Sequence, residues 1–245
     1  MNKRNYTVCA NRMAAPKVYR LELAAEGAPQ LQAGSFVEVA VPGKFLRRPL
    51  SVSLSEPGKL TLLYKVVGEG TAWLAQVQPG DTLELLTGLG NGFDTEACRQ
   101  HALLIGGGIG VAPLHQLCRD LRAAGREVTA LLGFNTTAEV LLRDELEALG
   151  AKVHIATIDG SCGIEGLVTD ALKQLHPDFD HYYVCGPMPM MRELYPMLPV
   201  RGEFSLEERM GCGTGLCFGC TIPTTEGPRR ICHEGPVFHK NILPW

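Results

Sequence analysis

The stretch that organises this chain is Gly211-Cys212-Gly213-Thr214-Gly215-Leu216-Cys217-Phe218-Gly219-Cys220, and a fourth cysteine follows at Cys232. Its spacing, C-x4-C-x2-C with a distant fourth cysteine, is typical of plant-type [2Fe–2S] clusters. Four glycines in the stretch would let the backbone wrap closely around inorganic sulfur, because glycine has no Cβ and tolerates positive φ. The spacing therefore predicts a [2Fe–2S] cluster. Its ligands would be Cys212, Cys217, Cys220 and Cys232.

Two other arrangements use four cysteines and stay open from the spacing alone. A zinc site usually pairs its cysteines as two short Cys-x-x-Cys units, whereas here three ligands share one loop. Disulfides require an exported protein, but the nine cysteines of this chain are odd in number and spread along its length. That distribution fits a reducing cytoplasm better. We therefore favour iron–sulfur ligation, and a cluster that moves single electrons needs a donor and an acceptor.

Bulk composition bounds the remaining possibilities. The 245 residues suffice for two medium domains and a small appendage. A net charge of −3 gives no support for binding to nucleic acid or to a membrane surface. No apolar run approaches the roughly 18 to 20 residues that span a bilayer, and no apolar segment follows the basic residues at the N-terminus as a signal peptide requires. We expect a cytoplasmic protein.

The first third of the chain, residues 1–98, alternates apolar and polar residues with a period of two. This alternation predicts short strands, and the turn signals between them indicate an antiparallel barrel. The predicted strands are 18–23, 36–41, 60–67 and 82–86. A single helix is expected over 70–77.

Two features of this barrel could bind a diphosphate. In Arg47–Ser53 a guanidinium precedes a hydroxyl on a segment stiffened by proline, and the forked donors of arginine suit a diphosphate. The second feature, Gly68–Thr71, begins the predicted helix, where free N–H groups attract anions. A charged edge strand followed by an ordinary capped helix would look the same.

Residues 99–200 change to an alternation of apolar strands and helices, which predicts βαβ units and a parallel sheet with its ligand at the carboxyl ends of the strands. The expected strands are 102–105, 128–132, 153–156 and 181–185. The first opens into the glycine-rich turn 106–110, which is not the G-x-G-x-x-G fingerprint but still allows a pyrophosphate to approach. The last opens into 185–191. Tight helix–strand packing is the alternative explanation for both turns.

Nucleotide preference is only weakly marked. The stretch 134–137, after the second predicted strand, holds neither an acidic residue for a ribose 2′-hydroxyl nor an arginine cluster for a 2′-phosphate. NAD is favoured over NADP by a small margin.

The order of these features resembles the ferredoxin–NADP reductase superfamily. The resemblance is carried by Arg48-Pro49-Leu50-Ser51, Gly70-Thr71, the stretch 106–114 and Cys185-Gly186-Pro187-Met188. The cysteine module, with 205–210 before it and 235–238 after it, narrows the resemblance to the electron-transfer subunits of class 1B, NAD-dependent dihydroorotate dehydrogenases.

The resemblance implies a β barrel plus α/β fold in three parts. These are an antiparallel FAD-binding barrel (1–98), a parallel-sheet NAD-binding domain (99–200) and a small [2Fe–2S] module (201–245). The residues implied for FAD are Arg48, Pro49, Leu50, Ser51, Leu63, Tyr64, Lys65, Gly70 and Thr71. Those implied for NAD are Gly107, Gly108, Gly110, Val111, Ala112, Cys185, Gly186, Pro187 and Met188.

The resemblance also implies a function in pyrimidine biosynthesis. Electrons would pass from the FMN of a catalytic partner subunit through [2Fe–2S] and FAD to NAD+, within a heterotetramer of two copies of each subunit. No residue of this chain would act on dihydroorotate. The rival expectation is the flavin and [2Fe–2S] subunit of an NAD(P)H:ferredoxin or sulfide-type oxidoreductase. A third, from another class, is a zinc-stabilised binding module.

Overall fold

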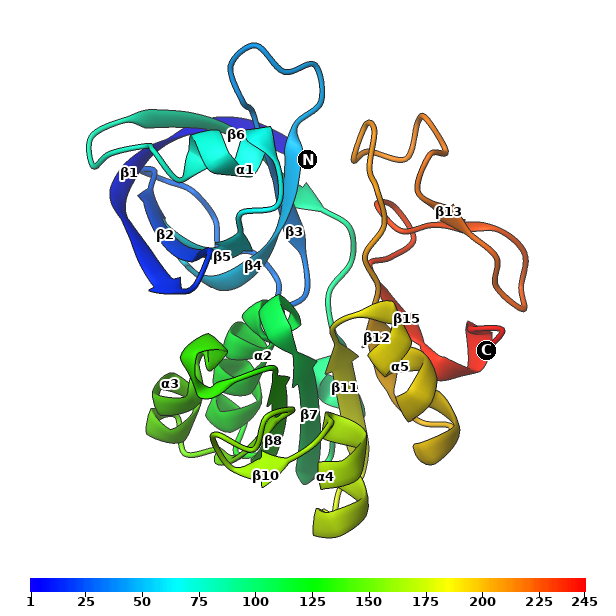
Figure 1. Cartoon of the computed structure of the whole chain (residues 1–245). Helices are drawn as coiled ribbons and strands as arrows, with labels where there is room; N and C mark the ends of the chain where they lie inside the picture. Colours follow the sequence, from blue (N-terminus) through cyan, green and yellow to red (C-terminus); the bar gives the residue numbers. More distant parts are fainter.

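The structure, a computed structural model, describes all residues from 1 to 245. Figure 1 shows three parts along the chain: a barrel in blue and cyan, a sheet flanked by helices in green and yellow, and loops in orange and red. The predicted fold class, a β barrel plus α/β, is confirmed.

The barrel has six antiparallel strands and is closed, in the order β1-β2-β5-β4-β3-β6. Its strands are β1 (Asn2–Ala15), β2 (Val18–Ala24), β3 (Phe36–Val39), β4 (Arg48–Glu56), β5 (Lys59–Lys65) and β6 (Thr82–Leu89). Alternate side chains such as Leu21, Val37 and Leu62 fill the interior, as the period of two predicts. Helix α1 (Glu69–Leu74) adds Leu74 to the same core.

The second part is a seven-stranded sheet in the order β10-β9-β8-β7-β11-β12-β15, in which every neighbouring pair is parallel except β12 with β15. Its strands are β7 (His101–Gly107), β8 (Glu127–Phe134), β9 (Lys152–Thr157), β10 (Ile164–Glu165), β11 (His181–Cys185), β12 (Glu203–Ser205) and β15 (Val237–His239). Strand β7 is buried on both faces, which explains its continuous apolar run.

Helices cover both faces of this sheet (Figure 1). They are α2 (Ala112–Ala123), α3 (Arg143–Ala148), α4 (Val168–Leu175) and α5 (Met188–Leu194). Leu104 of β7 packs in one core with residues of α2 and α3. Its neighbours Leu103 and Ile105 pack in a second core with residues of α4 and α5. Five short 3-10 helices complete the chain, at Thr95–Ala97, Gly108–Val111, Thr137–Glu139, Tyr195–Met197 and Lys240–Ile242.

A buried glutamine joins the barrel to the sheet. Gln116 of α2 accepts a hydrogen bond from the backbone N–H of Ser55 (2.8 Å) and donates one to the carbonyl of Leu31 (2.6 Å). Because Gln116 is almost fully buried, these two bonds have no competition from water. The carboxyl ends of the sheet strands are thereby held against the barrel.

The C-terminal segment is bound to the sheet at both of its ends. Strand β12 pairs with β11 and strand β15 pairs with β12, and the cysteine loop runs between them with the small ribbon β13 (Thr221–Ile222) and β14 (Arg229–Arg230). The residues predicted as the third part therefore complete the sheet of the second. The division at residues 98 and 200 stays a prediction.

No helix of the chain combines the length and the apolar character that crossing a bilayer requires.

Candidate redox site

The cysteine loop points backbone N–H groups at its sulfurs. The Sγ atom of Cys212 accepts hydrogen bonds from the N–H groups of Thr214 (3.4 Å), Leu216 (3.2 Å) and Cys217 (3.4 Å). The Sγ atom of Cys232 accepts one from Gly215 (3.2 Å). Such bonds stabilise thiolates, which are the form that binds iron.

The four sulfurs are arranged as two pairs. The backbone N–H of Cys217 donates to Sγ of Cys212 (3.4 Å), and the backbone N–H of Cys232 donates to Sγ of Cys220 (3.4 Å). Burial opposes ionisation of Cys212, but the bonds from Thr214 and Cys217 outweigh it and lower the pKa of Cys212. Burial, followed by the bond with Cys220, raises the pKa of Cys232.

No three His, Cys, Asp or Glu side chains converge on a position for one metal ion. A [2Fe–2S] cluster has two irons and four cysteine ligands, so it requires one pair of sulfurs for each iron. The paired sulfurs and the N–H donors fit this group, and the residues present could hold it.

Two of the glycines predicted to allow a tight cysteine loop have backbone angles or close contacts that require glycine. Gly213 and Gly215 have positive φ angles of 64° and 87°. A Cβ on Gly215 would lie 2.7 Å from Cδ2 of His233. Substitution there would displace the N–H that reaches Cys232.

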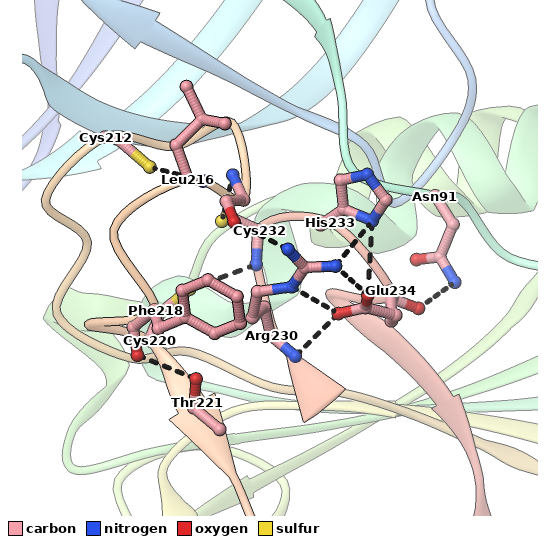
Figure 2. Close-up of polar contacts among 11 residues, drawn as sticks. Asn91, Cys212, Leu216, Phe218, Cys220, Thr221, Arg230, Cys232, His233 and Glu234 are labelled. Atoms are coloured by element: carbon pink, nitrogen blue, oxygen red, sulfur yellow. Dashed lines mark hydrogen bonds and ion pairs between the residues drawn. The ribbon is translucent and has the colours of Figure 1, made fainter. Parts of the chain in front are cut away.

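An arginine network that the sequence analysis missed holds this loop. Figure 2 shows Arg230 joined to Glu234, with the ring of Phe218 beside it. Arg230 donates from Nη1 to the carbonyl of Gly215 (2.6 Å) and pairs with the Glu234 carboxylate. The bond from Arg230 lowers the pKa of Glu234 to about 2. The pair lies four residues apart in sequence, but its contact with the loop appears only in the folded chain.

The glycine-rich turns predicted for NAD border a cavity of about 450 Å³ at the carboxyl ends of β7, β8, β9 and β11. Six predicted cofactor residues line it, namely Lys65, Gly107, Gly108, Gly110, Gly186 and Pro187. Five of these six were predicted for NAD, and the other four residues predicted for NAD do not line it. Val111 and Ala112 are buried where α2 begins, Cys185 is buried, and Met188 begins α5.

Gly110 brings the two glycine-rich turns together. A Cβ on Gly110 would lie 2.7 Å from the carbonyl oxygen of Cys185 and 2.5 Å from Cα of Gly186. Only glycine allows this approach, because backbone atoms cannot rotate away as a flexible side chain can. The sequence analysis offered two explanations for these glycines, approach of a pyrophosphate and tight packing. Gly110 shows that one residue can serve both.

Acidic side chains that the sequence analysis did not single out also line the cavity. The stretch 134–137 holds no carboxylate, but Glu139 lies just beyond it and accepts a hydrogen bond from the Asn135 side chain (2.6 Å). Looking two residues further along the sequence would have found it. Glu207 lines the cavity as well, and burial by the surrounding protein raises the pKa of this carboxyl.

Cys185 has no reactive character in this site. Its side chain is buried in the sheet core, and burial raises the pKa of the thiol, with a further contribution from Glu207. The thiol is therefore neutral at physiological pH. A packing role fits this environment.

Only some of the residues predicted for FAD lie close to one another in the structure. The guanidinium of Arg48 lies so close to the start of α1 that a Cβ on Gly70 would collide with it. The Thr71 hydroxyl accepts hydrogen bonds from the N–H groups of Val67 (2.9 Å) and Gly68 (3.2 Å). Leu50 packs toward the barrel core. Tyr64 points into that core and donates its hydroxyl to Asn11 (3.1 Å), so its ring does not face outward.

An anion bound between β4 and the start of α1 would contact the guanidinium of Arg48. If Arg48 binds FAD as predicted, Arg48→Ala is expected to weaken FAD retention by roughly tenfold or more, because a charge-assisted contact to the diphosphate would be lost. The [2Fe–2S] absorbance should stay. The measurement is the dissociation constant of FAD from reconstituted protein, with Arg12→Ala as a control on the exposed part of β1. An unchanged FAD affinity would remove Arg48 from the site.

The barrel, the nucleotide cavity and the cysteine loop together define an iron–sulfur oxidoreductase on a flavin-reductase fold. Two family models match the chain: the oxidoreductase NAD-binding domain at residues 104–195, and the iron–sulfur cluster binding domain of dihydroorotate dehydrogenase B at residues 207–243. The chain belongs to the family of electron transfer subunits of NAD+-dependent dihydroorotate dehydrogenase B.

Relatives in this family match over nearly the full length. The electron transfer subunit of dihydroorotate dehydrogenase B (NAD(+)) from Bacillus caldolyticus is 44% identical, with 97% of each chain covered. That from Lysinibacillus sphaericus is 39% identical, with 96% of each chain covered.

Solved structures agree on the fold. The NADH-dependent reduced ferredoxin–NADP oxidoreductase superimposes with a TM-score of 0.89 at 28% identity, covering 98% of this chain and 90% of that one. A ferredoxin–NADP+ reductase from Neisseria gonorrhoeae, with bound FAD and NADP, has a TM-score of 0.69 at 19% identity, covering 79% and 89%. These findings support the predicted cofactor set of FAD, a [2Fe–2S] cluster and NAD.

Proposed function

We propose that this chain carries electrons from the FMN of a dihydroorotate dehydrogenase catalytic subunit to NAD+. The observation that supports this most is the packing of the cysteine loop against the barrel. Phe36, on the outer face of β3, shares a core with the cluster ligands Cys220 and Cys232. Strand β3 pairs with β4, the strand that carries the predicted flavin segment. The cysteine loop and the flavin segment are thus separated by a single strand.

Each site has a distinct task in this proposal. Bound FAD would supply the chemistry that links single-electron transfer to hydride transfer, which a [2Fe–2S] cluster cannot perform. The paired cysteines hold the cluster, and their N–H donors stabilise its charge. Arg48 and the start of α1 bind the flavin diphosphate. The turns at Gly107–Gly110 and Gly186–Pro187 would bind the pyrophosphate of NAD in the cavity that they line.

The finer points of the prediction belong to the same proposal. The partner carries FMN, the assembly holds two copies of each subunit, and the complex works in the cytoplasm, where cysteine thiols remain reduced. The predicted division at residues 98 and 200 separates the flavin, NAD and cluster functions. This chain supplies no general base toward dihydroorotate.

The test is reconstitution with the catalytic subunit. Dihydroorotate-dependent formation of NADH should need both subunits, whereas NADH-to-dye activity should remain in this chain alone. Dihydroorotate oxidation by the purified single chain would contradict the proposal. The rival, an NAD(P)H:ferredoxin oxidoreductase subunit, has support from the structural match at 28% identity. Ferredoxin reduction by the isolated chain, without dihydroorotate activity in the complex, would favour it.

Glu139 gives a prediction on nucleotide choice. Its carboxylate lines the cavity at the end of β8, where an acidic side chain pairs with a ribose 2′-hydroxyl and repels a 2′-phosphate. Glu139→Gln is expected to lower the preference for NADH over NADPH by about tenfold, the equivalent of one charge-assisted hydrogen bond. The measurement is the ratio of kcat/KM for the two nucleotides.

A matched control for this prediction lies on the next helix. Glu147 of α3 is ion-paired with Arg143 (3.2 Å) and does not line the cavity. Glu147→Gln should leave the ratio unchanged. If Glu139→Gln also leaves it unchanged, then Glu139 does not select the nucleotide.

A further inference from the structure

A buried glutamate lies between the barrel and the cysteine loop. Glu38 is in the middle of β3 and is only 2% exposed. Its neighbours in sequence, Val37 and Val39, pack inside the barrel. Because side chains alternate along a strand, Glu38 points outward, on the same side as Phe36. It therefore lies on the face against which the cysteine loop packs.

On one side Glu38 adjoins the predicted flavin segment. Residues directly opposite each other in an antiparallel pair project from the same face of the sheet. Glu38 is paired with Pro49 of β4, and Phe36 is paired with Ser51. The outer face of β3 and β4 thus carries Glu38 beside Pro49 and Ser51, two of the residues predicted for FAD.

On the other side Glu38 meets the cluster loop. A Cβ on Gly213 would collide with the Glu38 carboxyl, at 2.7 Å from Oε2 and closer to its other atoms. Gly213 directly follows the ligand Cys212, and its φ angle of 64° is one that glycine adopts without strain. The carboxyl of Glu38 is therefore in close contact with the backbone of the loop next to a cluster ligand.

The carboxylate of Glu38 lacks a hydrogen-bond partner for one of its two oxygens. Its Oε1 atom is buried and has no hydrogen-bond partner. Arg47 is the nearby cation, but its guanidinium is paired with Glu84. Burial raises the pKa of Glu38, while Arg47 opposes this and Cys212 adds to it. A side chain that served only to fill space here would be better apolar, because an unpartnered buried oxygen reduces stability.

We propose that Glu38 is a positioning residue that seats the cluster loop on the flavin face of the barrel. This rests on the proposed function. The carboxyl fills the space under Gly213, and its shape sets where Cys212 lies relative to the flavin segment on β4. Loss of that shape should slow electron passage between the cluster and the flavin, without removing either group.

The test measures electron passage in the full chain carrying FAD and its cluster. The protein is reduced with dithionite, freed of excess reductant and mixed with NAD+, and re-oxidation of the cluster is followed by its visible absorbance. Glu38→Ala is expected to slow this re-oxidation roughly tenfold or more, since misplacement by about 1 Å can cost that much. Glu38→Gln, which keeps the shape, should stay within about twofold of the unsubstituted chain.

A double substitution tests the contact itself. Gly213→Ala should slow re-oxidation because its methyl group displaces the loop from Glu38. In Glu38→Ala/Gly213→Ala the methyl group enters the vacated space, so re-oxidation should be faster than in Gly213→Ala alone. Independent effects of the two substitutions would show that the residues do not act through one contact.

Glu84→Ala is the matched control, because Glu84 also binds Arg47 but is partly exposed on β6. It should leave the rate unchanged. Iron and acid-labile sulfide are measured in every variant to show that clusters are present. If Glu38→Ala re-oxidises as fast as the unsubstituted chain, the inference is wrong while the proposed function stands. If the unsubstituted chain itself transfers no electrons to NAD+, both are wrong.

Discussion

Cys217→Ser is expected to remove or destabilise the [2Fe–2S] cluster and to lower electron delivery to the partner subunit by about a hundredfold or more. Cys217 is one member of the pair formed with Cys212, and it receives a single weak N–H bond, from Gly219 at 3.5 Å. It is also exposed, so the loop offers little else to retain iron if this thiolate is lost. Flavin reduction by NADH should survive, because the nucleotide cavity is built from other elements.

The measurement combines iron content, the visible spectrum and dihydroorotate-dependent NADH formation in the reconstituted complex. Cys9→Ser serves as the control, since Cys9 is exposed on β1 and far from the loop in sequence. It should behave as the unsubstituted chain. A Cys217→Ser protein that loses FAD but keeps a full cluster would contradict the assignment of the two sites.

Gly110→Ala is expected to raise the KM for NADH by about a hundredfold, because its methyl group would collide with the backbone of Cys185 and Gly186. Overpacking against atoms that cannot rotate away costs about 1–3 kcal/mol, and each 1.4 kcal/mol is a factor of ten in affinity. The two turns that we propose bind the pyrophosphate would be forced apart. Cluster and flavin spectra should be unchanged.

The control is Gly125→Ala, in the same part of the chain. Gly125 has a positive φ (76°), which Gly110 does not, and a Cβ there would meet nothing within 4 Å. It should lower thermal stability slightly and leave the KM unchanged. If Gly110→Ala has the KM of the unsubstituted chain, the contact between the turns is not part of the NADH site.

Local patterns in the sequence were sufficient for the fold class, although the predicted strands included only four of the six barrel strands and omitted β1 and β4. The period of two in the first third corresponds to the barrel, and the apolar run 102–105 corresponds to β7, which is buried on both faces. The cysteine spacing is local as well, because three of the predicted ligands lie within nine residues of one loop. Each of these predictions needed only residues that are close together in the sequence.

Features made by distant parts of the chain were not predictable in this way. Strands β12 and β15 have only three residues each, too few for a pattern, and pairing across the cysteine loop makes them part of the sheet. Glu38 appears in the sequence as one polar residue of an alternating strand, and only the folded loop buries it. Whether Tyr64 could contact FAD also depends on the direction of its side chain, and in the folded barrel this side chain points inward.

The most direct test of the central claim is electron paramagnetic resonance on the isolated chain, prepared anaerobically with full iron and flavin. Dithionite reduction should produce the rhombic signal of a reduced [2Fe–2S] cluster, and NAD+ should then remove that signal as NADH forms. If no rhombic signal appears, or if it persists when NAD+ is added, this chain does not join a [2Fe–2S] cluster to NAD.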